Sequence, residues 1–300
     1  MMPILVVGSI ALDTVKTPFG EVTETLGGSA TYFAFAASFF TNINMVAVVG
    51  EDFPPSYLEL LRSRPIDLRG LEIRKGKTFR WSGLYGYDLN ERDTLSVALN
   101  VFEDFHPVLS HEFKESPCVF LANIDPELHL EVINQLKAPK VIVCDTMNIW
   151  IENKRSVLEK TLKHVDILVL NDGEARELAQ EANLIKAGKI ILGFGPRAVI
   201  IKKGEHGAVY LSPTSYFSVP AYPLESVFDP TGAGDSFAGG FLGYLAKMGI
   251  DEEKTIKPAM VYGTVMASFT VEDFSLNRLK MVRPEEIEAR FREIKRITHF

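Results

Sequence analysis

The stretch FDPTGAGDSFAGGF, residues 228–241, holds the pattern from which the fold and the chemistry of this 300-residue chain can be inferred. Pro230 cannot lie inside a helix and restricts the residue before it, so the chain should approach in an extended form. From Asp235 to Met248 the apolar residues have helical spacing, and residues 232–234 before them are small. The stretch therefore predicts an extended approach, a glycine turn and the start of a helix.

A helix start of this kind suits a phosphate group. The first turn exposes unpaired N–H groups and about half a positive charge, and small side chains at Gly232, Ala233 and Gly234 let a phosphate approach them. Donors in this position stabilise the charge that accumulates on a phosphoryl group during transfer. Asp235 follows directly, and a carboxylate there can take the proton of an attacking hydroxyl. We therefore expect an anion hole with Asp235 as general base.

Two other interpretations of these residues remain open on the sequence alone. Asp235 could simply complement the helix dipole. Gly232 and Gly234 could form a distorted dinucleotide-binding fingerprint, but that motif follows a first strand and needs an acid about 20 residues later. Asp251 and Glu252, near that spacing, fall in a polar loop. No GxxxxGK followed by Ser or Thr is present, which excludes the P-loop kinases.

Short β-rich runs alternate with helical patterns along the chain. The strand candidates have apolar residues on both faces, as strands covered by helices do; they are residues 4–8, 45–50, 119–124, 141–144, 167–170 and 198–201. The helix candidates are residues 29–40, 127–136, 154–165, 174–181 and 284–297. This order predicts a mostly parallel sheet with helices on both faces.

Two segments, residues 14–26 and 73–101, break this order. They have little helical periodicity and are rich in Thr, Val, Tyr and Phe. We expect them to form a small β-sheet that stands off the main body and covers a substrate; a structural hairpin or a dimer edge is the alternative. Because no linker is evident, the chain is expected to form one domain over residues 1–300.

Composition narrows the class of protein. The chain is 46% hydrophobic and 24% charged, near globular averages. Its net charge of −7 argues against a nucleic-acid surface, and no run approaches the length of a membrane span. The apolar run at the N-terminus is short and has no basic flank, unlike a signal peptide. Cys118 and Cys144 lie in apolar runs and should be buried thiols. A cytoplasmic protein without nucleic-acid or membrane partners is expected.

Residues 229–235 closely resemble the C-terminal signature of the ribokinase-like carbohydrate kinases, the pfkB family, which is Asp-x-Thr-Gly-Ala-Gly-Asp followed by a helix. The resemblance extends over nearly the whole chain. Gly27-Gly28 before an Ala-rich helix is similar to the family's sugar-site glycine pair, residues 171–174 to its Asn-x-x-Glu element, and residues 203–207 to its Gly-x-x-Gly turn near the nucleotide. The implied fold is a Rossmann-like three-layer α/β/α doubly wound sheet, mostly parallel, with a small β-sheet lid.

The implied activity is transfer of the γ-phosphoryl of ATP, with Mg²⁺, to a hydroxyl of a small sugar or sugar-like substrate, most naturally a hydroxymethyl. By the resemblance, Asp235 is the catalytic base, the backbone of 232–235 is the anion hole, and Glu174 holds Mg²⁺ through water. Asp229 matches a position near a monovalent cation such as K⁺ in many members. The other residues assigned to the nucleotide side are Asn171, Lys202, Gly204, Gly207 and Thr231.

The acceptor pocket is assigned by the same resemblance and by the rule that open α/β sheets bind ligands at the carboxyl ends of their strands. A carboxylate at Asp13 suits a vicinal diol. The remaining candidates are Gly27, Gly28, Ser29, Asn123, Asp145 and, from the lid, Arg80 with Trp81.

Two departures from the family pattern concern the acceptor and the nucleotide. Tyr32 stands where the family often has Asn, and Lys202-Lys203 where uncharged residues are usual. Tyr32 therefore leaves a specific assignment as ribokinase or fructokinase open, and a nucleoside or polyol acceptor is the alternative. A non-catalytic ligand-binding relative is a further alternative, against which the intact Asp235 and Gly232–Gly234 argue. A homodimer through the lid is a further possibility that the sequence does not establish.

Overall fold

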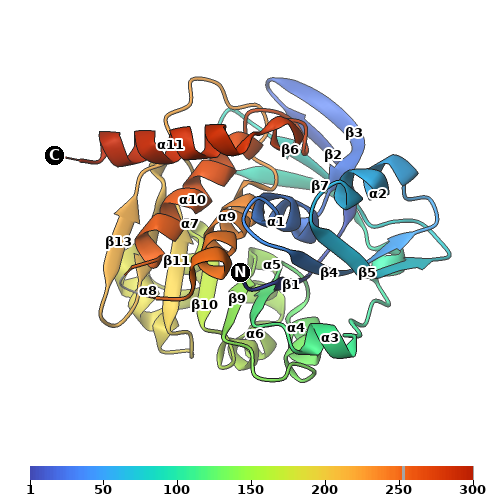
Figure 1. Cartoon of the computed structure of the whole chain (residues 1–300), viewed down its shortest axis with the longest axis horizontal. Helices are drawn as coiled ribbons and strands as arrows, with labels where there is room; N and C mark the ends of the chain where they lie inside the picture. The colour runs from blue at the N-terminus through green and yellow to red at the C-terminus, as the bar shows by residue number, and fades with distance from the viewer. Residues whose placement is uncertain (252–253, 300) are drawn as a thin grey trace.

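The computed structural model describes residues 1–251 and 254–299, so Glu252 lies outside the described residues. A nine-stranded sheet, ordered β13-β12-β11-β10-β9-β8-β1-β4-β5, crosses the molecule (Figure 1). All pairs from β5 to β11 are parallel, and β12 and β13 continue the sheet antiparallel. The strands are β1 (Ile4–Val7), β4 (Ile43–Gly50), β5 (Ile66–Arg74), β8 (Cys118–Leu121), β9 (Val141–Asp145), β10 (Ile167–Asn171), β11 (Ala198–Lys202), β12 (Ala208–Leu211) and β13 (Tyr216–Val219).

Helices cover both faces of this sheet, as the apolar runs predicted. In β1, Ile4 and Val6 pack into one core while Leu5 and Val7 pack into the other. The first core lies beneath α1 (Ser29–Ala37), α2 (Pro55–Arg62), α9 (Ala233–Met248), α10 (Ile256–Thr270) and α11 (Pro284–Ile297). The second lies beneath α3 (His111–Lys114), α4 (Pro126–Ile133), α5 (Asn148–Asn153), α6 (Arg155–Leu162), α7 (Asp172–Ala179) and α8 (Leu184–Leu192). The predicted α/β/α layering is confirmed.

A second sheet, called the lid below, has the order β3-β2-β6-β7. Its strands are β2 (Ala11–Thr17), β3 (Gly20–Gly27), β6 (Arg80–Tyr85) and β7 (Arg92–Ala98), with β2 and β6 parallel and the outer pairs antiparallel. The small sheet was expected, but its bounds differ from the predicted segments. Residues 73 and 74 belong instead to β5, at the edge of the main sheet. The sequence did not predict β5 as a strand because its residues are polar and half-exposed.

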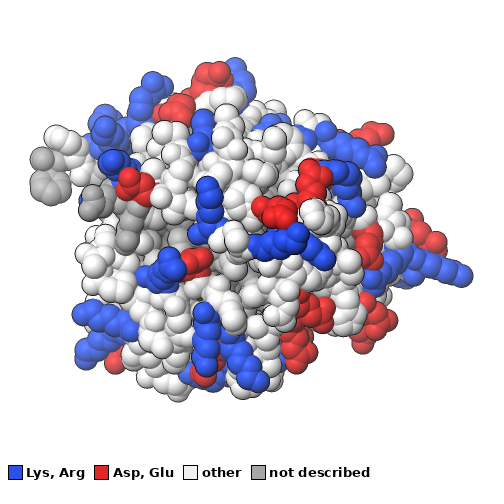
Figure 2. Space-filling view, turned by 60° about the horizontal axis from the view of Figure 1, so that its bottom comes forward, with Lys and Arg blue, Asp and Glu red and all other residues white. Residues whose placement is uncertain are grey.

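The surface carries charges of both signs. On the face shown in Figure 2, basic and acidic side chains are interspersed rather than gathered into one field. Within residues 1–251 and 254–299, no helix combines the length and the apolar character that crossing a bilayer requires. Cys118 and Cys144 are buried free thiols, as expected.

Close packing of α1 against α9 brings the starts of these two helices together. A Cβ at Gly239 would lie 2.5 Å from the carbonyl oxygen of Phe33 and 2.9 Å from Cβ of Ala36, so only glycine fits at this contact. At the helix starts, a Cβ on Gly232 would lie 2.3 Å from Cγ of Tyr32. The contact therefore sets where the glycine turn of residues 232–234 lies.

Gly239→Ala tests this contact. The added methyl group must push α1 and α9 apart, and overpacking of this kind should lower the free energy of unfolding by about 1–3 kcal/mol. Urea unfolding of the purified protein measures the change. Gly86→Ala is the matched control, because nothing lies within 4 Å of its added Cβ and its effect should stay within about 0.5 kcal/mol. Equal stability of the two variants would show that α1 and α9 are not closely packed.

Candidate active site

A cavity of about 1830 Å³ lies between the lid and the carboxyl ends of the parallel strands. Most residues that the sequence assigned to the site line it, although they come from distant parts of the chain: Asp13, Gly28, Ser29, Asn123, Asp145, Asn171, Glu174, Lys202, Gly204, Gly207 and residues 231–235. Three assigned residues, Gly27, Arg80 and Asp229, do not line the cavity. The structure thus gathers nearly all of the predicted site around one space.

The helix start predicted at residues 232–235 lies at this cavity. Gly232 is the N-cap of α9 and has φ 75°, a conformation that favours glycine. The N–H of Ala233 donates to the carbonyl of Pro230, and that of Ser236 to Gly232. Within the described part of the chain, the amides of Gly234 and Asp235 have no hydrogen-bond acceptor. Two unpaired amides at a helix N-terminus can bind an anion.

Lys202 supplies a positive charge beside this helix start. Its side chain extends from the end of β11 and is 17% exposed, with Nζ 3.4 Å from Oδ2 of Asp145. A Cβ at Gly234 would lie 2.6 Å from the same nitrogen, so the ammonium of Lys202 lies directly against the glycine turn. Burial alone would lower the pKa of Lys202, but the carboxylates of Asp145, Glu174 and Asp235 outweigh it and raise the pKa. Lys202 therefore stays charged.

Asp235 lies in the first turn of α9, on the cavity floor. Burial raises the pKa of Asp235 well above its ordinary value, and the charge of Asp145 raises it further, while Lys202 and Arg92 oppose the shift. A carboxylate with a raised pKa is a stronger base than one in water. The position and the basicity of Asp235 both suit proton removal from a group bound in the cavity.

Asn171 and Glu174 are joined in a capping box at the start of α7. The N–H of Glu174 donates to Oδ1 of Asn171, and the N–H of Asn171 donates to Oε2 of Glu174, each at 2.8 Å. Burial raises the pKa of Glu174 to about 7, and Asp145 contributes to the rise. Within the described ranges, no three His, Cys, Asp or Glu side chains are grouped to hold a metal ion by themselves. A metal at this point would need ligands from water or substrate as well.

Asp13 depends on the glycine pair at the end of β3, where Gly27 is the last strand residue and Gly28 follows it. A Cβ at Gly27 would lie 1.8 Å from Oδ2 of Asp13, and one at Gly28, where φ is 95°, would lie 2.5 Å from the carbonyl oxygen of Ser9. Burial raises the pKa of Asp13 to about 7, although a hydrogen bond from the Gly28 backbone opposes the rise. Gly27 therefore makes room for the carboxyl group instead of lining the cavity. Both glycines were expected, and this is the physical reason for them.

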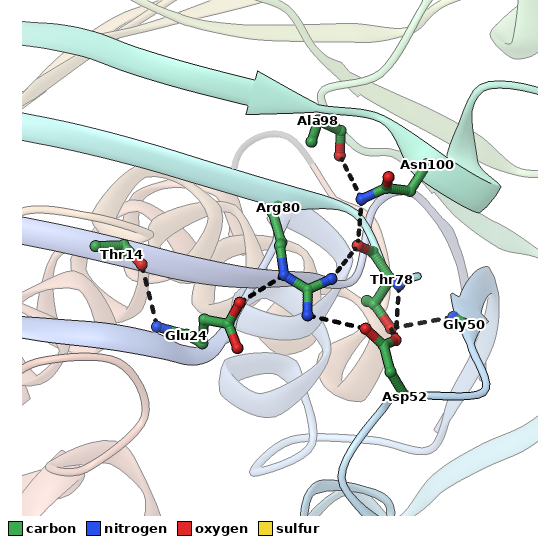
Figure 3. A network of polar contacts seen from close by, with 8 residues as sticks. All are labelled: Thr14, Glu24, Gly50, Asp52, Thr78, Arg80, Ala98 and Asn100. Carbon is green, nitrogen blue, oxygen red and sulfur yellow. Dashed lines mark hydrogen bonds and ion pairs between the residues drawn. The ribbon is translucent and has the colours of Figure 1, made fainter. Parts of the chain in front are cut away.

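Arg80 was expected to contact substrate, and the structure does not support that expectation. Its Nε donates to Oε1 of Glu24 at 2.6 Å and its Nη2 to Oδ2 of Asp52 at 2.8 Å (Figure 3). Successive residues of a strand face opposite sides, so Trp81 faces the cavity and Arg80 cannot. The second oxygen of Asp52 accepts from the N–H of Thr78, which precedes β6. Arg80 therefore ties the lid to the loop after β4.

Asp229 lies behind the cavity wall, whereas Thr231 forms part of that wall. The Asp229 side chain is 1% exposed; its Oδ1 accepts from the N–H of Thr231 at 2.9 Å. Its Oδ2 is buried without a hydrogen-bond partner among the described residues. The hydroxyl of Thr231 donates to that of Tyr85 in β6 at 3.2 Å. An unpaired buried carboxylate oxygen fits a small cation, while Thr231 links the helix start to the lid.

The lid also contacts the turn that was assigned to the nucleotide. In the β6–β7 turn, Nδ2 of Asn90 donates to Oε2 of Glu205 at 2.7 Å. Gly204 has φ 53°, and a Cβ on it would lie 1.8 Å from Oδ1 of Asn90. Gly207 has φ 81°, where a Cβ would lie 2.0 Å from the carbonyl oxygen of Val219. Gly204 therefore leaves room for the lid turn, whereas Gly207 leaves room for the end of β13.

Sequence reasoning missed several residues of the cavity. Arg92 and Tyr85 of the lid line it, together with the aromatic residues Phe79, Phe102 and Trp150. Trp150 donates its indole N–H to Oδ1 of Asn123 at 3.0 Å, which links the aromatic wall to the end of β8. Alternation along β6 and β7 would have pointed to Tyr85 and Arg92 if the pairing of the two strands had been known.

Comparisons with known proteins agree with this geometry. Residues 1–280 match the family described as pfkB family carbohydrate kinase. The chain is 31% identical over 261 residues to the cytidine kinase of Thermococcus kodakarensis, which covers 84% of this chain and 92% of that protein. It is 24% identical over 314 residues to the ribokinase of Lactococcus lactis, with 98% of each chain covered.

Among solved structures, the nucleoside kinase of Methanocaldococcus jannaschii, an archaeal member of the ribokinase family, superposes with a TM-score of 0.77. The sequences are 21% identical, and 98% of this chain and 99% of that one are covered, so the fold is shared throughout. The signature at residues 229–235, the family match and the cytidine kinase relative lead to one conclusion: this chain belongs to the pfkB family of carbohydrate kinases and is a phosphotransferase with a hydroxyl group as acceptor.

Proposed function

We propose that this chain transfers the γ-phosphoryl group of ATP to the hydroxymethyl group of a nucleoside. The observation that carries the proposal is the start of α9, where two unpaired amides, Lys202 and the carboxyl group of Asp235 share the cavity floor. Preorganised donors and a nearby base are what phosphoryl transfer to a hydroxyl requires. Asp13 lines the same cavity as Asp235.

The size and lining of the cavity favour a nucleoside over a free sugar. Single-ligand pockets commonly measure about 300–1,000 Å³, so about 1830 Å³ leaves room for ATP and a second sizeable ligand. Beyond the polar floor, the walls carry Phe79, Trp81, Phe102 and Trp150. Aromatic side chains of this kind stack on nucleobases, and a free sugar would leave much of that wall unused. The cytidine kinase relative supports the same acceptor class.

The chemistry follows from the positions of these groups. The acceptor oxygen attacks the γ-phosphorus, the bond from that phosphorus to the bridging oxygen breaks with its electron pair leaving on ADP, and the acceptor proton passes to Asp235. The amides of Gly234 and Asp235 stabilise the charge on the moving group. Asp13 accepts hydrogen bonds from the hydroxyls of the ribose. The lid excludes water, which would otherwise receive the phosphoryl group.

Two cations complete the proposal. Mg²⁺, when bound with ATP, neutralises charge on the phosphate oxygens. Glu174 lines the cavity and would hold its hydration water, with Asn171 fixing the carboxyl group through the capping box. Asp229 would hold a monovalent cation such as K⁺, because its Oδ2 is buried and lacks a partner among the described residues.

Asp235→Asn tests the base. The amide keeps the size of the side chain but cannot accept the proton, so turnover should fall by about two to four orders of magnitude while ADP binding and thermal stability hold. Steady-state ADP release in the presence of the acceptor, together with a melting curve, gives both quantities. Turnover within a few-fold of the unmodified protein would exclude Asp235 as the base.

The acceptor itself is tested with a panel. Cytidine, uridine, inosine, adenosine, ribose, fructose and myo-inositol are each supplied with ATP and Mg²⁺, and ADP release is measured. We expect at least one nucleoside to give a kcat/KM about 5- to 150-fold above that of ribose, since base stacking of about 1–3 kcal/mol is lost with the free sugar. A sugar or inositol that exceeds every nucleoside would make this chain a sugar or polyol kinase.

A pH profile tests the ionisation of Asp13. Because kcat/KM reports the free enzyme, it should rise as pH increases through about 7, where Asp13 and Glu174 both lose their protons and Asp13 becomes a hydrogen-bond acceptor for the ribose. The raised pKa also means that the folded protein binds more protons than the unfolded chain between about pH 4 and pH 7. Stability without ligand should therefore fall over this range, and less so in Asp13→Asn. An activity limb near pH 4 would contradict the burial of Asp13.

A further inference from the structure

The last helix of the chain, α11, lies outside the cavity but supports part of its wall. It packs against α10 at the edge of the molecule (Figure 1). Arg290 of α11 points inward, and its side chain is only 12% exposed. Two of the residues that it contacts, Tyr222 and Ser268, line the cavity, whereas Arg290 itself does not. The family match covers residues 1–280 and therefore ends before α11 begins.

The guanidinium of Arg290 is held both by hydrogen bonds and by aromatic rings. Nη1 donates to Oγ of Ser268 at 2.7 Å, and Nη2 donates to Oε1 of Glu272 at 2.8 Å. Its Cζ lies 3.8 Å from the centroid of the Phe269 ring and 4.6 Å from that of the Tyr222 ring. A planar guanidinium that is paired and stacked in this way is fixed in place. Arg290 therefore ties the loop after β13, which carries Tyr222, to the C-terminal part of α10, which carries Ser268.

The contacts made by α11 also orient the two wall residues. The hydroxyl of Ser268 donates to the carbonyl oxygen of Val265 at 2.7 Å, so the hydrogen bond from Arg290 uses the same oxygen as an acceptor. The hydroxyl of Tyr222 donates to Oε2 of Glu293 at 2.7 Å, and Glu293 lies one turn after Arg290 on α11. The helix thus holds Tyr222 at two points, through its hydroxyl and through the face of its ring. Both contacts fix the orientation of the ring at the cavity wall.

This part of the wall lies on the donor side of the cavity. Tyr222 follows β13, the strand at one edge of the main sheet, and α10 packs against β12 and β13. Asn123 and Trp150, proposed for the acceptor, follow β8 and β9 nearer the centre of that sheet. The loop of Tyr222 also packs on the turn assigned to the nucleotide, because a Cβ at Gly207 would lie 2.7 Å from the backbone nitrogen of Ala221.

The character of this wall suits a base better than a phosphate group. The other residues that line it are mostly apolar: Pro223, Leu224, Val227, Thr264, Ala267 and Val271. The charged groups of the floor, Lys202 and Asp235, belong to the end of β11 and the start of α9. An apolar wall with a tyrosine ring offers the base of ATP a surface on which to stack, while its phosphates reach the floor.

We propose that Arg290 is a positioning residue that holds the donor-base wall from behind, so that α11 determines how tightly the base of ATP is bound. This inference rests on the proposed phosphoryl transfer from ATP, but not on the identity of the acceptor. Without the guanidinium, the tie between the loop of Tyr222 and α10 is lost, and the two can separate. The base then loses part of its wall, whereas the phosphates keep Lys202 and the amides of α9.

Arg290→Leu is compared with Arg278→Leu. Arg278 also pairs with Glu272, at 3.2 Å, and its guanidinium also lies over the Phe269 ring, at 5.0 Å. None of its partners, which are Glu272, Glu286 and Phe269, lines the cavity. Both variants therefore remove a buried arginine from the same cluster, but only Arg290→Leu releases the wall.

Steady-state kinetics with the best acceptor separates the two variants. Arg290→Leu should raise KM for ATP by about tenfold, within the roughly 5- to 150-fold that stacking of one base contributes. Its kcat and its KM for the acceptor should change less than about threefold, because the floor is untouched. Arg278→Leu should lower the melting temperature similarly, yet leave KM for ATP within about twofold. If Arg290→Leu does not fold, Arg290→Lys replaces it; the ammonium can pair with Glu272 but lacks the planar face, so KM for ATP should still rise.

A second measurement needs no acceptor. Calorimetry with Mg²⁺ compares the binding of ADP with that of inorganic tripolyphosphate, which has a phosphate chain but no base. Arg290→Leu should weaken ADP binding by about tenfold and leave tripolyphosphate binding within about twofold. An unchanged affinity for ADP, an equal loss for tripolyphosphate, or an equal effect of Arg278→Leu would overturn the role of Arg290. If ADP binds but no acceptor is phosphorylated, the proposed function fails, and this comparison still decides on Arg290. Absence of ADP binding to the unmodified protein would overturn both.

Discussion

The ion pair between Lys202 and Asp145 is the interaction on which the polar floor of the cavity depends. Three carboxyl groups face this one ammonium, and burial by itself would drive all of them toward the neutral state. Their combined charge keeps Lys202 protonated, and Lys202 in turn opposes the rise in the pKa of each acid. Without the ammonium, Asp235 would hold its proton more firmly and would be a base only at higher pH. The floor therefore works as one electrostatic unit rather than as separate residues.

The parallel sheet is what brings this unit together. Asn171 lies opposite Lys202 in the register of β10 and β11, and Asp145 lies opposite Val169 in the register of β9 and β10. Parallel strands end at the same edge, so residues more than 25 positions apart reach the same space without any special loop. The start of α9 comes from the helical layer that also contains α1, and the contact of Gly239 with α1 holds it in place. Each layer thus supplies one part: the strands supply the charges, and the helix supplies the unpaired amides.

Local pattern was enough to predict the parts of the site that a single segment makes. Three features could be assigned because consecutive residues form each of them: the glycine turn at residues 232–234, Asp235 directly after it, and the glycine pair beside Asp13. The sheet and its two helical layers followed from runs that are apolar on both faces. Missed elements had no such signal: α10 is buried nearly all round and shows no polar face, and β5 is half exposed at an edge. Arg80 was assigned to the cavity, and Arg92 was overlooked, because only the pairing of β6 with β7 reveals which side each strand residue faces.

Tyr32 shows how a departure from the family pattern can be read in physical terms. Where the family often has a short amide, this chain places an aromatic ring directly beneath Gly232. The ring fills the space that the glycine turn leaves and backs it from the α1 side, so the turn has little freedom to collapse inward. Its hydroxyl is buried without a partner among the described residues. Burial is the main cause that raises the pKa of Tyr32, and the charges of Asp13 and Asp229 raise it further. An unpaired buried hydroxyl costs stability. The ring also joins α1, which follows Gly28, to α9, which follows Gly232, so it aligns the starts of those two helices.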